Sequence, residues 1–520
     1  MSTRSTTILT TFAGVMLSMA PADAADAAGM TRGGRVVTWP AVEPVEIGLE
    51  PQLFIDHYLI AEHQGLTRTT HPPRRAQPGP ILGWQQGTTQ PYLTVVRDPA
   101  SGRFRMWYNQ NIGPGCAIAY AESADGIRWE TPRLGILGDD NRVLNISVPE
   151  RGGFGVSVID EGPDFPDRTR RFKVVWWGVG SPAKTTATGD RGASLCVAFS
   201  PDGLHWTPWP DNPVLAGVDD IVDVFRDPFR RRYAVFFKTS ADPSDGYTQG
   251  LRAGGHIRRL VSASVSDDFI HWRTPWRVLM PEPRDEGQLE FYSIGGTIAR
   301  GGLLIGFVRM LHDDYPANEG GGPDGIGYST LVTSRDGVNW ERHDDVFFDR
   351  SPDPAAWDRA MSWIGCALPV GEELYLYYGG YRRGHKIEPT RERQIGLARM
   401  PMDRFVSRDA KGDRPGRLLT VPLRLPDGAA HRLTLNADAS DGRIRVQLRD
   451  ARSGDVLRGY GLDDCAPVRG DARALPVEWK DKKDLPRGTV RLELEITGAA
   501  LFGFRAENPN RLGESGPGPR

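Results

Sequence analysis

The stretch "SRDGVNW" at residues 334–340 is one of four copies of a short motif in this chain. "SADGIRW" stands at 123–129, "SPDGLHW" at 200–206, and "SDDFIHW", in which Phe269 replaces the glycine, at 266–272. The copies begin at residues 123, 200, 266 and 334, so their spacing is nearly regular. A regular internal repeat indicates an architecture built from copies of one supersecondary unit.

Each motif copy closes a similar unit of short strands and tight turns. The first unit reads "QPYLTVVRDPASGRFRMWYN" and "CAIAYAES" before its motif, and three further units follow the same order. A fifth, "SWIGCALPVGEELYLYYGGY" and "QIGLARM", keeps the strands but lacks the motif. A lone four-stranded sheet cannot bury both faces, so such sheets pack radially as blades. The sequence predicts an all-β protein with a five-bladed β-propeller.

The motif itself has a structural explanation. Asp-Gly favours a tight turn in which glycine adopts a positive φ, and Ser and Asp side chains accept hydrogen bonds from nearby backbone N–H groups. The tryptophan is expected to begin the outer strand and to pack between blades. The motif therefore marks the turn between the third and fourth strands of a blade. Four separate ligand sites are the alternative interpretation.

The triplet "RDP" occurs twice, at 97–99 and 226–228. It resembles a catalytic motif of glycoside hydrolase family 32. Here a turn and a second strand follow it at once, so we predict that Asp98 and Asp227 are turn residues, and we carry no catalytic role onto them.

Apolar and polar residues alternate again after residue 416, as in "HRLTLNADA" and "VRLELEITG", which predicts a second all-β domain, a β-sandwich. The predicted organisation is: signal peptide 1–24, N-terminal linker 25–50, β-propeller 51–406, linker 407–416, β-sandwich 417–508 and disordered tail 509–520.

Composition restricts the class of protein. The 520 residues are 25% charged with a net charge of −2, which gives no indication of a nucleic-acid or membrane partner.

The N-terminus predicts an export signal, because it contains a basic residue (Arg4), a short apolar run (8–20) and the small-residue site "ADA" (22–24). A secreted or periplasmic protein is therefore expected, unless translation starts at Met30. The four cysteines are too few for a disulfide scaffold, and Cys116, Cys196 and Cys366 are expected to be buried thiols. No metal-ligand spacing occurs, so no metal or cofactor is expected.

A propeller followed by a sandwich resembles the glycoside hydrolases of families 32, 43, 62 and 68. More specifically, "LFIDHYLI" at 53–60 and "IGLARMPMDRFVSRDAKGDRPGRLLTVPLRL" at 395–425 resemble exported bacterial proteins described as similar to family 32. The resemblance covers roughly residues 50 to 508 and implies a carbohydrate substrate. The family 32 signature Trp-Met-Asn-Asp-Pro-Asn-Gly and its Glu-Cys pair are absent, which puts fructan hydrolysis in doubt.

The chemistry is expected where the innermost strand of each blade begins. Glycoside hydrolysis needs two carboxyl groups there, often with a third that tunes them. We predict Glu290 as general acid, Asp223 as base or nucleophile, and Asp56 as supporting carboxylate, with Asp220 as the alternative to Asp223. The alternative, structural interpretations are an ion pair within the blade for Asp223, a solvated loop acid for Glu290 and an acid that caps an entry strand for Asp56. The other expected substrate-binding residues are Gln90, Tyr92, Asp220, Tyr292, Arg309, Trp363, Arg359, His71 and His385.

The leading hypothesis is an exported glycoside hydrolase, with furanosides among the candidate substrates. The first alternative is a non-catalytic glycan-binding propeller, which needs no converging acids. The second is a sialidase-like enzyme, suggested by the repeated motif, but that class needs three clustered arginines and usually six blades. Arg258, Arg259, Arg309 and Arg359 leave an acidic sugar open as a substrate. The sequence does not indicate the sugar, the linkage or the oligomeric state.

Overall fold

The structure is a computed structural model. It describes residues 30–32, 35–37, 43–86, 88–111, 115–147, 153–179, 193–240, 252–253, 256–280, 282, 285, 289–318, 320–385, 387, 393–427 and 431–508. The predicted export signal (1–24) and tail (509–520) lie outside these residues. In the described part the regular elements are strands and two short 3-10 helices, η1 (Trp84–Gln86) and η2 (Arg168–Arg170). No helix in that part has the length and apolar character needed to cross a membrane.

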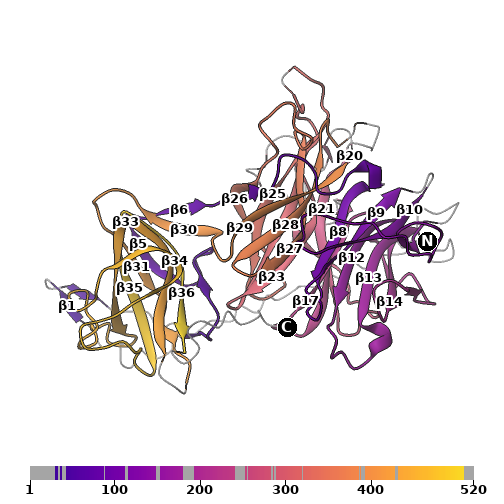
Figure 1. Cartoon of the computed structure of the whole chain (residues 1–520). Helices are drawn as coiled ribbons and strands as arrows, with labels where there is room; N and C mark the ends of the chain where they lie inside the picture. Colours follow the sequence, from indigo (N-terminus) through magenta and orange to yellow (C-terminus); the bar gives the residue numbers. More distant parts are fainter. Residues whose placement is uncertain are drawn as a thin grey trace, which may run out of the picture.

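Five antiparallel units of four main strands follow one another along the chain, and a parallel pairing of Gly327 with Met361 joins the fourth and fifth into one sheet (Figure 1). From the innermost strand outward, blade 1 is β8 (Thr88–Arg97), β9 (Phe104–Asn111), β10 (Cys116–Ser123) and β11 (Arg142–Asn145). Blade 2 is β12 (Gly153–Asp160), β13 (Phe172–Val179), β14 (Ala193–Ser200) and β15 (Thr207–Pro208), with β16 (Leu215–Ala216) beside β14. Blade 3 is β17 (Val222–Asp227), β18 (Arg232–Ser240), β21 (Arg259–Ser266) and β22 (Trp276–Leu279).

Blade 4 is β23 (Leu289–Arg300), β24 (Leu303–His312), β25 (Ile326–Ser334) and β26 (Glu341–Phe348). Blade 5 is β27 (Met361–Val370), β28 (Glu373–Tyr381), β29 (Gln394–Pro401) and β7 (Arg74–Arg75). Its outer strand therefore comes from the N-terminal part of the chain. Two small hairpins stand apart from the blades, β1 (Met30–Arg32) with β2 (Arg35–Val37), and β19 (Arg252–Ala253) with β20 (His256–Ile257).

The inner strands form a closed ring. β8 lies beside β12, β12 beside β17, β17 beside β23, β23 beside β27, and β27 beside β8. Apolar side chains fill the space between neighbouring blades, for example Phe236 of blade 3 and Phe291 of blade 4 in one buried cluster. The predicted five-bladed propeller is confirmed.

The four repeated motifs form nearly identical turns. In each, the serine hydroxyl accepts a hydrogen bond at 2.9 Å from the backbone N–H three residues later. One aspartate oxygen accepts two further backbone bonds, as Asp125 does from Ile127 and Arg128 at 2.8 Å. The glycine position has a positive φ, 75° at Gly126 and 73° at Phe269. The turn geometry therefore holds even where the glycine is replaced.

Each of these turns also contacts the preceding blade. The Tyr377 hydroxyl of blade 5 donates to the Gly126 carbonyl at 3.0 Å, which ties the last blade to the first. Trp107 Nε1 of blade 1 donates to the Gly203 carbonyl at 2.7 Å. The motif tryptophans add apolar contacts between blades, and Trp340 meets Phe236 edge-on at 5.1 Å. The structural interpretation of the motif is confirmed.

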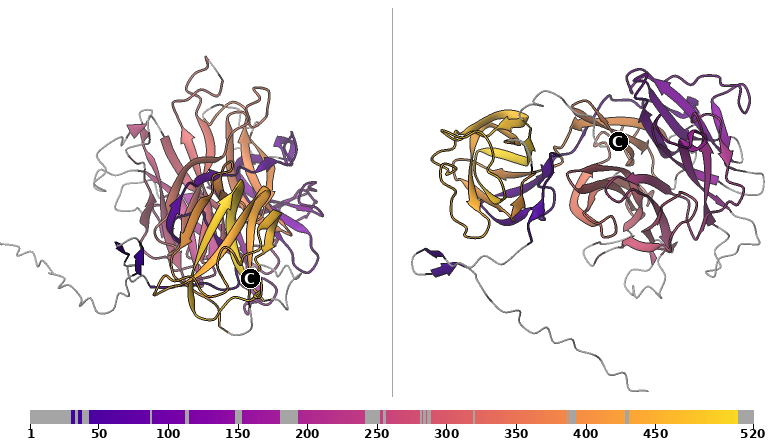
Figure 2. Two further views of the ribbon diagram at one scale, coloured as in Figure 1. Left: turned by 90° about the vertical axis from the view of Figure 1, so that its left-hand side faces the viewer. Right: turned by 90° about the horizontal axis from the view of Figure 1, so that it is seen from below.

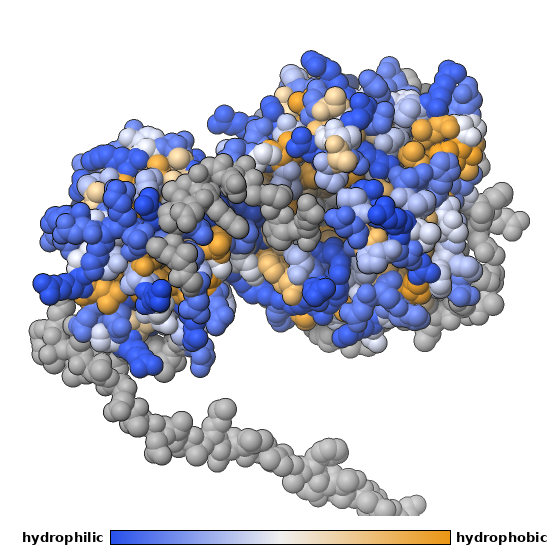
Figure 3. Space-filling view, turned by 60° about the horizontal axis from the view of Figure 1, so that its bottom comes forward, coloured by the Kyte–Doolittle hydropathy of each residue, from blue (hydrophilic) through white to orange (hydrophobic). Residues whose placement is uncertain are grey.

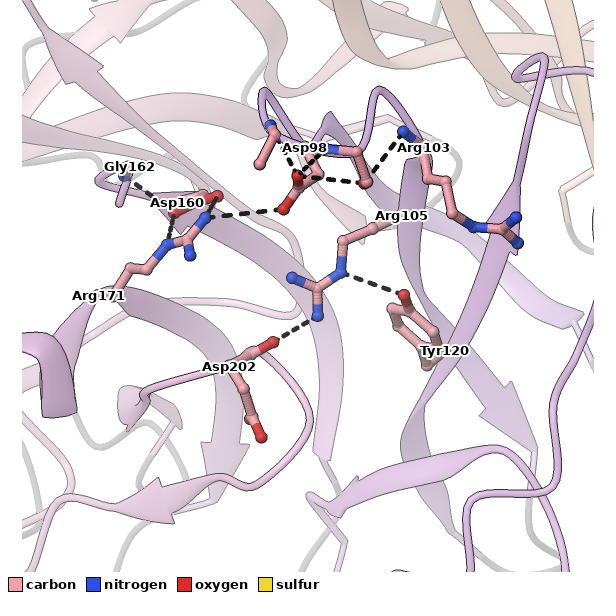
Figure 4. A network of polar contacts seen from close by, with 10 residues as sticks. Asp98, Arg103, Arg105, Tyr120, Asp160, Gly162, Arg171 and Asp202 are labelled. Atoms are coloured by element: carbon pink, nitrogen blue, oxygen red, sulfur yellow. Dashed lines mark hydrogen bonds and ion pairs between the residues drawn. The ribbon is translucent and has the colours of Figure 1, made fainter. Parts of the chain in front are cut away.

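The two "RDP" aspartates lie in turns between the first and second strands, as predicted. Asp98 accepts from the backbone of Ala100 and Ser101 at 2.9 and 2.8 Å, and Asp227 accepts from Phe229 and Arg230 at 3.0 and 3.2 Å. Figure 4 shows Asp98 beside Arg171, which binds Asp160 at 2.7 Å. This polar network joins the turns of blades 1 and 2 to each other.

The second domain is a β-sandwich. Its strands are β3 (Val45–Glu46), β4 (Gln52–Leu53), β5 (Ile60–Gln64), β6 (Thr67–Thr70), β30 (Val406–Ala410), β31 (Gly416–Thr420), β32 (Leu423–Arg424), β33 (Arg432–Asp450), β34 (Val468–Pro476), β35 (Thr489–Thr497) and β36 (Ala499–Glu507). The long β33 pairs with β36 through its first half and with β35 through its second. It therefore runs from one layer into the other, and one apolar core lies between them.

The domain boundaries differ from the prediction. Strands β4, β5 and β6 fall inside the expected propeller range 51–406 but pair with β36, β31 and β30 of the sandwich. The expected linker 407–416 contains most of β30 and the first residue of β31. The short N-terminal strands carry no clear apolar alternation, so their distant partners could not be found from the sequence.

The two domains form separate lobes, which lie side by side in Figure 1 and in the right-hand view of Figure 2. Arg300 of β23 binds Asp403 through Nε at 2.7 Å, close to the point where the chain leaves the propeller. On the face drawn in Figure 3, hydrophilic residues predominate on both lobes and apolar residues form small groups among them. All four cysteines are buried and free, which confirms the prediction for Cys116, Cys196 and Cys366.

Candidate functional site

The inner strands of a propeller run in the same direction, so their first residues meet at one end of the ring. We call this end the mouth. The connections between β24 and β25 and between β28 and β29 return to it, because the second strand of each blade runs back toward the start of the first. The repeated motifs and the "RDP" turns lie at the opposite end.

Blade 3 brings two acids and a lysine to the mouth. Lys238 Nζ, at the end of β18, lies 2.5 Å from Asp220 Oδ1 and 3.4 Å from Asp219 Oδ2. Burial by itself raises the pKa of Asp220, but the charge and hydrogen bond of Lys238 outweigh it, and the pKa is lowered. Burial raises the pKa of Asp219. One ionised and one more easily protonated carboxyl therefore share this lysine.

Blade 4 contributes a second acid group beside the first. Glu290 is fully buried, and Arg259 Nη1 lies 3.0 and 2.8 Å from its two carboxylate oxygens. Arg259 also lies 3.7 Å from Asp313. Burial raises the pKa of Glu290, Arg259 opposes that rise, and Asp313 adds to it. The net effect favours a protonated Glu290 at higher pH than for an exposed glutamate.

Tyr292 connects the two acid groups. The Lys238 ammonium lies 4.9 Å and the Arg259 guanidinium 5.9 Å from the centre of its ring. Its other side meets Trp363 at 4.9 Å and His385 at 5.4 Å between ring centres. Glu290 and Asp220 therefore come from adjacent blades and approach the same tyrosine through their cationic partners.

The aromatic residues predicted to stack on a sugar are themselves buried. Tyr292 and Trp363 have almost no exposed surface, and Trp363 Nε1 donates to the Met310 carbonyl at 2.8 Å. Tyr92 is also buried, and its pKa is raised well above its usual value by burial and by the charge of Asp220. Together they form the floor beneath the acids rather than an open platform.

His385 is held neutral within this group. Burial first, and then the positive charges of Arg393 and Lys238, lower its pKa to about 3. Its ring lies 5.6 Å from that of Trp363. His385 therefore lies beside Tyr292 and Trp363, and its side chain is uncharged at neutral pH.

Both carboxylate oxygens of Asp223, the predicted base, accept hydrogen bonds from neighbouring side chains. Arg309 donates from Nη1 to Oδ2 at 2.7 Å and from Nη2 to Oδ1 at 2.9 Å. The Ser293 hydroxyl adds a third bond at 2.7 Å. Since Arg309 is itself buried, this pair joins blades 3 and 4 and occupies both carboxylate oxygens of Asp223.

The predicted place of Asp56 at the mouth is wrong. Its carboxylate binds Arg335 at 2.9 and 3.0 Å, and Arg335 belongs to the motif turn of blade 4 at the opposite end of the propeller. In the sequence Asp56 stands between Phe54 and Tyr58, a pattern typical of a strand. In the structure residues 54–59 form no strand of the propeller blades. Asp56 therefore cannot support Glu290 directly.

The remaining candidates are dispersed. His71 lies at the junction of the domains, where its Nε2 is 2.7 Å from the Ser407 hydroxyl, so its predicted place at the mouth is wrong. Arg359 precedes β27 and donates to the Ser351 carbonyl at 3.2 Å. Gln90 lies in β8.

Sequence reasoning missed Lys238 and Asp313. Both follow an apolar strand directly, in "YAVFFK" and "LLIGFVRMLHD". In each blade the end of the second strand lies beside the start of the first strand. A charged residue at the end of a predicted second strand was therefore the available signal for a residue at the mouth. Among the described residues no cluster of His, Cys, Asp and Glu is arranged to hold a metal ion.

Comparison with known proteins gives distant structural similarities only. No family model and no curated protein matches the chain. An N-acetylgalactosamine deacetylase from F. plautii, solved with blood group B trisaccharide, is similar at a TM-score of 0.43 and 16% identity over 66% of this chain and 97% of its own.

Two glycoside hydrolases are also similar. A family 43 arabinoxylan arabinofuranohydrolase from Bacillus subtilis has a TM-score of 0.38 at 11% identity, over 83% of this chain and 99% of its own. A family 32 β-fructofuranosidase from Bombyx mori has a TM-score of 0.38 at 13% identity, over 85% and 94%. At such low identity and TM-score these similarities do not decide what this chain does.

Proposed function

We propose that the protein is an exported glycoside hydrolase that cleaves a glycan or oligosaccharide at the mouth of the propeller. The observation that supports the proposal is that Arg259 and Lys238, the cationic partners of Glu290 and Asp220, both lie beside Tyr292. The two acids come from adjacent blades and approach Tyr292, and their environments move the two pKa values in opposite directions. Two carboxyl groups held in different protonation states are what acid-assisted glycoside cleavage requires.

Glu290 is the proposed general acid. Its raised pKa keeps a proton on the carboxyl at a pH where exposed glutamates have lost theirs. It would deliver that proton to the glycosidic oxygen as the bond to the leaving sugar breaks. Arg259, which contacts both carboxylate oxygens, would stabilise the charge left on Glu290 after the transfer.

Asp220 replaces Asp223 as the proposed base or nucleophile. Asp223 has both oxygens bound to Arg309, so using it would require breaking a buried ion pair. Asp220 is only partly buried, and Lys238 keeps it ionised. As a nucleophile it would attack the anomeric carbon, and as a base it would activate a water molecule. The separation of the two carboxyls in a substrate complex distinguishes these routes.

Export is proposed on the sequence alone, from the basic residue, the apolar run and the small-residue site within residues 1–24. An extracellular or periplasmic location would give the enzyme access to glycans outside the cytoplasm.

The test is a hydrolysis screen of the purified protein on furanosides, uronic-acid polymers and neutral oligosaccharides. Glu290→Gln and Asp220→Asn should each lower kcat by roughly a hundredfold or more, because each removes a proton-transfer or nucleophilic group. Asp219→Asn is the matched control, since it changes the neighbouring acid on the same lysine and should have a much smaller effect.

A non-catalytic glycan-binding protein is the second candidate, because cations already neutralise the acids at the mouth. In that case the wild-type protein hydrolyses nothing in the screen, and the two amide variants still bind the same glycans. That combination would reject the enzyme proposal.

A further inference from the structure

An exposed tyrosine, stacked on a largely buried histidine, stands on the rim of the mouth. Tyr315, in the connection between β24 and β25, is 43% exposed. Its ring lies flat against that of His312, with centres 4.3 Å apart and planes 8° from parallel. The buried aromatic residues of the floor offer no such open face, so this pair is a different kind of feature.

The pair is held in place by its surroundings. Tyr328 lies with its hydroxyl 3.4 Å from His312 Nε2. The Tyr315 carbonyl accepts from Gly325 at 3.2 Å, and the Gly325 carbonyl in turn accepts from His385 at 3.1 Å. The rim connection is therefore fastened by backbone bonds to the floor of the mouth.

The pair also lies close to the proposed acid. His312 is the cross-strand partner of Leu289, which immediately precedes Glu290, and Asp313 is the next residue along the rim. Asp313 shares Arg259 with Glu290. The connection that carries Tyr315 therefore begins directly beside Glu290.

The surrounding charges indicate the class of sugar. Burial lowers the pKa of His312, and the charge of Arg258 adds to this effect, so the imidazole beneath Tyr315 is neutral at neutral pH. Arg258 is itself buried and donates to the Leu289 carbonyl at 2.7 Å. Asp314 is partly exposed, with its Oδ1 3.9 Å from His312 Nδ1. A carboxylate there can accept hydrogen bonds from sugar hydroxyls but repels an acidic sugar.

We propose that Tyr315, supported by His312, is a stacking platform for a neutral sugar ring next to the cleaved unit, and therefore determines the preference for oligosaccharides over single glycosides. The C–H face of a sugar is apolar and covers an aromatic ring well, while its hydroxyls remain at the edge. The proposal rests on the proposed function, since it assigns a neighbouring subsite to the same mouth.

The test uses the catalytically impaired Glu290→Gln protein, so that bound glycans persist, on an array of neutral and uronic-acid glycans of one to six sugars. Adding Tyr315→Ala should weaken binding to the neutral oligosaccharides about five- to tenfold. Tyr315→Phe keeps the ring and should bind as the parent does. Because Tyr315 is at the surface, the thermal unfolding of the alanine variant should match that of its parent.

Three results would contradict the proposal that Tyr315 is a stacking platform. These are equal oligosaccharide binding with and without the Tyr315 ring, a loss confined to uronic-acid glycans, and a parent protein that binds no glycan on the array. The proposed function is judged separately, by comparing hydrolysis by the wild type and by Glu290→Gln. If hydrolysis depends on Glu290 while the Tyr315→Ala variant binds normally, only the platform fails.

Discussion

Asp223 and Arg309 form a two-fold hydrogen-bonded pair, at 2.7 and 2.9 Å, between the first strand of blade 3 and the second strand of blade 4. Arg309 also donates through Nε to the Ile364 carbonyl of blade 5 at 3.1 Å. One arginine therefore connects three consecutive blades. Such a contact holds the ring in shape, and its residues are better understood as structural than as catalytic.

Asp223→Asn should lower the free energy of unfolding by about 3 kcal/mol, because it leaves the buried Arg309 charge without its partner. Denaturant unfolding measures the change. The double variant Asp223→Asn, Arg309→Met should recover part of the loss, since no uncompensated charge remains. If the single variant is as stable as the wild type but inactive, Asp223 belongs to the catalytic pair after all.

The pH dependence of hydrolysis should follow the two acids. Asp220 must be ionised, so activity falls on the acid side as it gains a proton, and Glu290 must be protonated, so activity falls on the alkaline side as it loses one. Lys238 lowers the pKa of Asp220 and Arg259 lowers that of Glu290. Lys238→Met should therefore move the acid limb of kcat/KM to higher pH, and Arg259→Met should move the alkaline limb to higher pH.

His385→Gln is the control for these limbs. With a pKa lowered to about 3, His385 is neutral across the range in which Glu290 titrates, but its charge at lower pH contributes to the lowered pKa of Asp220. In this variant the alkaline limb should stay in place, and the acid limb should move only slightly to higher pH. A limb that disappears with His385 would assign the titration to the imidazole instead.

Phe269→Gly should destabilise the protein even though it relieves an unfavourable backbone conformation. A positive φ of 73° costs a non-glycine residue about 1–2 kcal/mol. The Phe269 ring, however, is buried against Phe199, Tyr233 and Trp272. Removing a buried phenylalanine costs about 3–5 kcal/mol, so we expect a net loss of about 2 kcal/mol in denaturant unfolding. A more stable variant would show that the strain outweighs the packing.

Arg75→Met should loosen the closure of the propeller. Arg75 Nε donates to the buried Asp358 at 2.6 Å, and the Tyr378 hydroxyl adds a bond at 3.0 Å. Without the guanidinium the buried carboxylate loses its charge partner, at a cost of about 3 kcal/mol. Hydrogen exchange in β29 should become faster. Arg74→Met, on the same short strand but exposed, is the matched control and should exchange like the wild type.

The blades could be predicted because their information is local. The Ser-x-Asp-Gly-x-x-Trp turns use hydrogen bonds within a few residues, so their sequence pattern survives in every copy, including the one with Phe269. The second domain was equally visible from alternation. By contrast, β7 has only two residues, Arg74 and Arg75, and its partners Ala398 and Arg399 lie far along the chain. Nothing in a two-residue strand specifies such a partner.

The site was predicted in part for the same reason. Glu290 and Asp220 stand next to the first residues of inner strands, and strand starts can be read from the sequence. The protonation and the role of each acid depend on its cationic partner, and that partner comes from another strand. The partners are Lys238 for Asp220, Arg259 for Glu290 and Arg309 for Asp223. An acid between two valines, such as Asp223, is therefore recognisable as buried, but not as structural or catalytic. Asp56 met the same sequence criteria and lies at the other end.

The chain passes between the two domains twice, at residues 71–73 and at 402–405, and the His71 N–H donates to the Phe405 carbonyl at 2.9 Å where the passages lie side by side. A protease that cuts either passage leaves the domains tethered by the other. Expressing residues 407–508 alone would give a sandwich without β3 to β6, and starting the propeller after residue 75 would leave β29 with a bare edge. The sandwich is therefore assembled from two stretches of the chain on either side of the propeller, and neither stretch contains all of its strands.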